Sequence, residues 1–126
     1  MSNYTLSHMD LSAPRSELHD LLKLTGAEIS CNNLPAGVSV PFVHSHTLNE
    51  EIYIVLEGAG MLYIDGEELP LKAGDCFRIA PEGERCVCAG KDSPIRFLCI
   101  QVRTDSLEGF TMGDGVISEK KPSWLS

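Results

Sequence analysis

The sequence predicts an all-β fold, a jelly-roll barrel or sandwich, preceded by one short helix. Three observations carry this prediction. Short apolar runs recur along the chain, glycines and turn residues separate them at fairly even intervals, and 126 residues suffice for one domain with a single core. We expect an N-terminal segment with the helix (1–26), a β-barrel (27–103), and a C-terminal tail (104–126) that packs on the barrel or on a partner.

The first expected element is the helix. Pro14 suits a first helical turn, Leu18, Leu21 and Leu22 recur on one helical face, and Gly26 can end the helix. This helix is expected to pack outside the barrel or on a partner subunit.

Strand signals follow from residue 27 onward. The segment 51–56 is the strongest, since it is apolar on both faces, as in a barrel strand. Asp65-Gly66 is a two-residue turn that favours a hairpin. About eight short strands are expected, over residues 27–34, 38–46, 51–56, 61–64, 69–71, 76–79, 86–88 and 95–102.

Composition and charge exclude several classes of partner. The formal net charge is -8 and the chain contains no block of basic residues, so neither nucleic acid nor an anionic membrane surface is an expected partner. No apolar stretch is long enough to span a bilayer, and the first residues lack the features of a signal peptide. Five cysteines, an odd count, favour reduced thiols and hence a cytoplasmic location.

One short segment has the residue types of a metal site. His44 and His46 stand two apart, and residues i and i+2 of a strand share a face. Glu51 opens the next apolar run, so a neighbouring strand could bring its carboxylate to the same point. Two imidazoles and a carboxylate can bind a first-row transition metal. Glu50 competes with Glu51, but adjacent strand residues face opposite ways.

The spacing of this segment extends into two longer motifs. The first contains Gly37, the two histidines, Glu51 and Gly58, and the second reads Gly74, Pro81-Glu-Gly83, Cys86 and Gly90. Together these motifs resemble those of the cupin superfamily, and the chain looks like a small single-domain cupin of the cupin-2 type. The resemblance implies a cupin-type jelly-roll β-barrel and selects Glu51 over Glu50 as the acid.

The resemblance also implies one divalent transition metal, which could be zinc, iron, nickel or manganese. His44, His46 and Glu51 would hold it. Cys86 stands where the family motif has a histidine. Its thiolate is a competent fourth ligand, whereas the alternative is a small buried core residue.

Three further residues are candidates for the cavity. Tyr53 shares the face of Glu51, so its hydroxyl could bind a substrate or donate a proton, or it could be a wall aromatic. Phe42 lies two residues before His44 and is expected to line the pocket. The face of Arg78 is left open by the sequence.

Two functional hypotheses follow. The first is a metal-dependent cupin that binds or acts on a small polar metabolite in the barrel mouth, as a dioxygenase or as an isomerase of a sugar or sugar acid with Tyr53 as proton carrier. The alternative is a non-catalytic ligand-binding or sensor module. A homodimer is expected in either case, because exposed sheet edges need cover.

Overall fold

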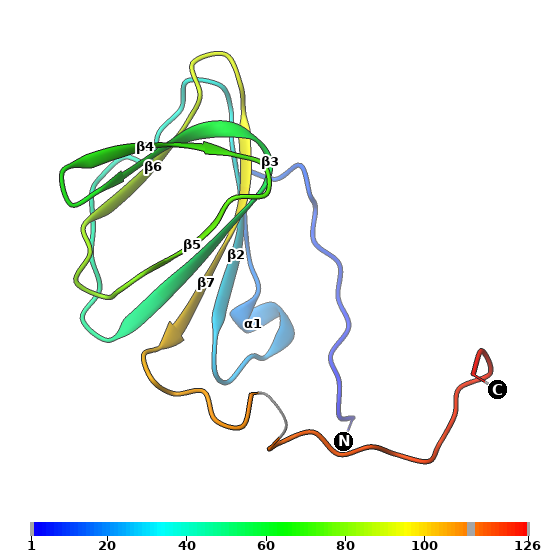
Figure 1. The fold of residues 1–126 in the computed structure, drawn as a ribbon. Coiled ribbons are helices and arrows are strands. Elements are labelled where there is room, and N and C mark those ends of the chain that lie inside the picture. Colours follow the sequence, from blue (N-terminus) through cyan, green and yellow to red (C-terminus); the bar gives the residue numbers. More distant parts are fainter. Residues whose placement is uncertain (1, 111–112, 126) are drawn as a thin grey trace.

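The computed structural model describes residues 2–110 and 113–125. Within this part of the chain nearly all regular structure is β, as the sequence predicts, and the paired strands are antiparallel. Figure 1 shows the strands curving around one interior in a barrel-like arrangement. The elements in chain order are β1 (Arg15–Glu17), α1 (His19–Leu22), β2 (Glu28–Leu34), β3 (Asn49–Ile64), β4 (Glu67–Lys72), β5 (Cys76–Ile79), β6 (Arg85–Ala89) and β7 (Ile95–Arg103).

Strand β3 connects the two halves of the fold. Its first part pairs with β5 and β7, and its second part pairs with β4 and β6. The sequence predicts two strands here, but a bulge between Val55 and Glu57 bends one continuous strand instead. Gly58 follows the bulge with φ of 80°, and a Cβ there would lie 1.8 Å from the carbonyl oxygen of Pro94. Only glycine therefore allows this bend.

The core lies between the two parts of β3 and the strands that pair with them. Alternate residues of β3, β6 and β7 point inward, and each fully buried aliphatic side chain among them contributes about 1.5–3 kcal/mol of hydrophobic stabilisation. The buried apolar cluster comprises Tyr53, Val55, Leu62, Leu71, Ile79, Val87, Ala89, Ile95 and Phe97. Glu51 and Arg85 are buried as well. The inward face thus carries two charged groups at one end of an apolar core.

The N-terminal helix is shorter and starts later than the sequence predicts. Residues Arg15–Glu17 form a strand that pairs with β2, and only the single turn His19–Leu22 is helical. The edge of β2 satisfies the backbone of 15–17 directly, which outweighs the weak local preference for a helix. Lys23 ends the turn with φ of 57°. No helix in residues 2–110 or 113–125 is long and apolar enough to cross a membrane.

The predicted strand over 38–46 is also not regular. Two isolated bridges hold this segment beside β6, one from Ser39 to Cys88 and one from His44 to Arg85. Pro41 lies between them and has no N–H to donate, so a continuous ladder cannot form. The backbones of His44 and Arg85 exchange two hydrogen bonds, of 3.1 and 2.9 Å. This pair anchors the start of the predicted metal-binding segment to β6.

Candidate metal centre

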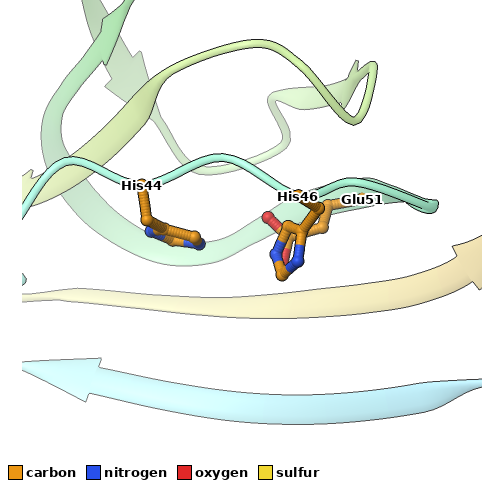
Figure 2. A group of neighbouring side chains, drawn as sticks. All are labelled: His44, His46 and Glu51. Carbon is orange, nitrogen blue, oxygen red and sulfur yellow. The ribbon is translucent and has the colours of Figure 1, made fainter.

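Three side chains that the sequence predicts as metal ligands converge in the structure. One ligand atom each of His44, His46 and Glu51 lies within 4.8 Å of the others (Figure 2). The histidines come from the irregular segment before β3, and Glu51 comes from the start of β3. The two imidazole centroids are 5.2 Å apart with an interplanar angle of 86°, and His46 Nε2 lies 3.1 Å from Glu51 Oε2. The sequence prediction that these three groups meet is therefore matched by their positions.

Glu51 is held from several sides. Its side chain is 5% exposed, and its Oε1 accepts a hydrogen bond of 2.8 Å from the hydroxyl of Tyr53. Burial raises the pKa of Glu51, but the Tyr53 hydrogen bond, with smaller contributions from His46, Cys99 and Arg85, outweighs burial, so the net shift of its pKa is downward. Glu51 is thus an ionised carboxylate in a buried place.

Arg85 is the residue that sequence reasoning missed. It is fully buried, its Nη1 lies 3.4 Å from Glu51 Oε1, and its Nη2 donates to the carbonyl of Ala80 at 2.7 Å. Arginine is usually exposed, which made an inward position improbable. The signal was the alternation in β6, where Arg85 shares the inward face with Val87 and Ala89. A buried guanidinium therefore stands beside the carboxylate of the candidate centre.

Cys86 is not among the three converging donors. Its thiol lies 3.3 Å from the carbonyl oxygen of Val40 and 3.7 Å from the hydroxyl of Ser39. Because Arg85 points inward, its neighbour Cys86 faces the other side of β6, although it still borders the cavity. The role of Cys86 as a fourth ligand stays a prediction that a cobalt spectrum can decide.

A cavity of about 310 Å³ opens beside the three donors, and both predicted substrate-binding residues border it. Tyr53 stacks on Phe77 with ring centroids 4.9 Å apart, and burial raises the pKa of its hydroxyl. Phe42 is 62% exposed at the rim and packs edge-on against His44. Arg78, whose face the sequence left open, is exposed and pairs with Glu50 outside the barrel.

The donor set fits a divalent transition metal. Burial, with smaller contributions from the neighbouring His46 and Arg85, outweighs the attraction of Glu51 and lowers the pKa of His44, which favours the neutral imidazole that binds metals. Its Nδ1 is buried without a hydrogen-bond partner, as expected where a further group completes the site. The guanidinium of Arg85 opposes a cation, because it already compensates the charge of Glu51. The centre is thus suited to a metal, but the guanidinium of Arg85 competes with the metal for the carboxylate of Glu51.

Comparisons with known proteins show the family and the fold of this chain. A family model described as a cupin domain matches residues 33–101. A solved cupin protein from Bacteroides fragilis is 59% identical with a TM-score of 0.91, covering 94% of this chain and 99% of that chain. A sugar phosphate isomerase of the cupin superfamily from Silicibacter pomeroyi is 29% identical with a TM-score of 0.62, covering 72% of this chain and 60% of that chain.

A curated relative carries a name that refers to a ligand. An oxalate-binding protein from Thermotoga maritima is 37% identical over 68 residues, which make up 53% of this chain and 54% of the relative. The chain spans about half the length of the curated relatives it matches.

Proposed function

The chain belongs to the cupin family, and from this premise we propose that it binds one divalent metal and, beside it, a small polar metabolite of anionic character. The observation that carries the proposal is the convergence of His44, His46 and Glu51 at the edge of a cavity of about 310 Å³. This volume lies at the small end of the range for ligand sites, which favours a metabolite of few atoms.

The charges around the centre favour an anion. The guanidinium of Arg85 compensates the carboxylate of Glu51, and the two imidazoles are neutral when they bind a metal. The protein would therefore neutralise little of the charge of a divalent cation bound here, and this cation would attract an anionic ligand. When bound, it would supply Lewis acidity toward an oxygen of that ligand. A small carboxylate such as oxalate, named by one relative, matches this charge, and the cavity has room for it.

Binding without catalysis is the second candidate, and the position of Tyr53 favours it over isomerisation. The hydroxyl of Tyr53 is engaged with Glu51, and its raised pKa makes it a poor source of protons near neutral pH. Tyr53 therefore orients Glu51 rather than carrying a proton. An isomerase of this kind would need another acid or base at the cavity. Among the described residues that line the cavity, Glu28 is the one carboxylate besides Glu51 and is therefore the candidate.

Isothermal titration tests the two parts of the proposal, the need for the metal and the class of ligand. Metal-loaded protein is titrated with oxalate, with a neutral diamide of the same size, and with a sugar phosphate. We expect oxalate to bind most tightly and only when metal is present. Equal oxalate binding by metal-free and metal-loaded protein would refute the role of the metal. Tighter binding of the sugar phosphate would refute the assignment of a small carboxylate.

A matched variant tests the site rather than the metal alone. His46→Ala removes one of the three donors at a partly exposed position, whereas His19→Ala removes an exposed histidine far along the chain from the centre. We expect His46→Ala to abolish oxalate binding and His19→Ala to leave it unchanged.

A further inference from the structure

The inward face of β2 is polar where it borders the cavity of the metal centre. Ser30 and Asn32 are 3% and 6% exposed, and Asn32 Nδ2 donates to Ser30 Oγ at 3.0 Å. Both residues line the cavity, and in Figure 2 the two imidazoles of the centre point toward β7 and β2. Buried polar groups cost free energy unless they have partners, so a wall that only filled the core would be apolar. This wall is therefore suited to meet a polar ligand.

Arg15 extends the polar wall from the neighbouring strand β1. The register places Arg15 opposite Asn32, and its Nη1 donates to Asn32 Oδ1 at 2.8 Å. Its Nη2 lies 3.7 Å from Glu17 Oε2, which is too long for a hydrogen bond, so most of the five N–H groups of this guanidinium remain free for a ligand. Arg15, Ser30 and Asn32 all precede residues 33–101, the part of the chain that the cupin domain matches. Membership of the family thus gives no information about this wall.

Arg85 supplies a second guanidinium to the same cavity. It is fully buried, and its Nε and Nη1 have no hydrogen-bond partner among the described residues. Buried N–H groups without partners are costly, which points to a ligand that accepts from them. Arg85 stands beside Glu51 of β3, whereas Arg15 lies on the far edge of the sheet, after β7 and β2. Three inter-strand spacings, together roughly 14 Å, separate the backbone of β1 from that of β3. The cavity therefore has one guanidinium at the metal centre and another on a distant wall.

The charges of the cavity favour a ligand with two negative charges. Among the described residues that line it, the full charges of Arg15 and Arg85 cancel those of Glu28 and Glu51. A bound divalent metal then leaves a charge of about +2, which a dianion neutralises. The two carboxylates of oxalate are bonded directly to each other, so oxalate cannot reach both the metal and Arg15. A dianion with carbon atoms between its carboxylates can place one at each end of the cavity.

We propose that the ligand is a dicarboxylate of this longer kind, with one carboxylate at the metal beside Arg85 and the other bound by Arg15. Arginine suits this contact, because its planar guanidinium pairs with a carboxylate through two parallel hydrogen bonds. Asn32 holds the guanidinium in place at 2.8 Å. Arg15 is then the residue that selects dicarboxylates over monocarboxylates. This inference rests on the proposed function, since one end of the ligand needs the metal.

A matched pair of ligands tests the proposal. Malate and lactate share the hydroxyl and carboxylate that a metal binds, but only malate has a second carboxylate. Each is titrated calorimetrically into metal-loaded, full-length protein, into Arg15→Met, and into Arg78→Met, which removes the same charge from an exposed ion pair outside the cavity. We expect the wild-type protein and Arg78→Met to bind malate at least tenfold more tightly than lactate. Arg15→Met should lose this preference and keep its affinity for lactate, which also shows that the variant is folded.

The possible failures are distinct. If the wild-type protein binds lactate and malate equally, and only with metal, the inference is wrong and the proposed function stands. A preference for malate that survives in Arg15→Met, or that Arg78→Met loses to the same extent, would also overturn the role of Arg15. If metal-loaded protein binds neither acid, the proposed function fails and the inference fails with it.

Discussion

Arg85→Met tests how the buried guanidinium controls the centre. The side chain of Arg85 is fully buried, and its Nη1 lies 3.4 Å from Glu51 Oε1. Methionine fills the volume of the aliphatic stem but leaves the carboxylate of Glu51 without its full-charge partner. In metal-free protein the variant should therefore be less stable, and a bound metal should compensate by supplying the missing positive charge.

The magnitude follows from the contacts that remain. Removing one partner of a buried ion pair costs about 3–5 kcal/mol. Glu51 keeps its hydrogen bond from Tyr53 and its contact with His46, so we expect a loss near 3 kcal/mol without metal. Because a unit charge at about 4 Å contributes several kcal/mol near a protein surface, removal of the competing cation should tighten metal binding at least tenfold.

Urea unfolding with and without metal, together with titration of the metal, measures both effects. Arg78→Met is the matched control, since Arg78 forms an exposed ion pair with Glu50 and its loss should cost less than about 1 kcal/mol. An equal loss of stability with and without metal would show that Arg85 only fills space. Weaker metal binding by Arg85→Met would refute the view that the guanidinium competes with the metal.

Three further predictions concern the same centre. Tyr53→Phe removes the donor to Glu51 and should lower the free energy of unfolding by about 1–2 kcal/mol, measured by urea denaturation. Cobalt-substituted protein should lack an intense thiolate band, because Cys86 is not among the converging donors; such a band, lost in Cys86→Ser, would make Cys86 a ligand. The folded-state pKa values of His44 and Glu51 are both lowered, so unfolding takes up protons at low pH. The free energy of unfolding of the metal-free protein should therefore fall as the pH drops below 6.5, and fall further below 4.5. Unfolding measured between about pH 8 and pH 4 checks this, and constant stability would contradict it.

Local patterns predicted most of the fold. Alternation located β2, β5 and β7 closely, and the turn at Asp65-Gly66 appears with positive φ at both residues, as that hairpin requires. The errors came from long-range effects. The bend after Val55 depends on the approach of Pro94, which is distant in sequence, and the strand at 15–17 depends on the free edge of β2.

The sequence predicted only part of the candidate site, because the rest of the site also depends on long-range contacts. His44, His46 and Glu51 could be found from spacing within one short segment. Arg85 lies 34 residues after Glu51, and its role depends on a strand pairing that no local pattern contains. The family motif drew attention to Cys86, whereas the inward register of β6 belongs to its neighbour. The buried position of Arg85 was the hardest feature to predict from the sequence, because arginine is usually exposed.

Metal stoichiometry tests the central claim most directly. Purified protein is loaded with a divalent metal, desalted and analysed by elemental analysis beside the double variant His44→Ala/His46→Ala. The account predicts about one metal per chain for the wild-type protein and none for the variant, with the β-sheet circular dichroism of the two unchanged. Full metal occupancy in the folded double variant, or no metal in the wild-type protein at saturating concentration, would contradict it.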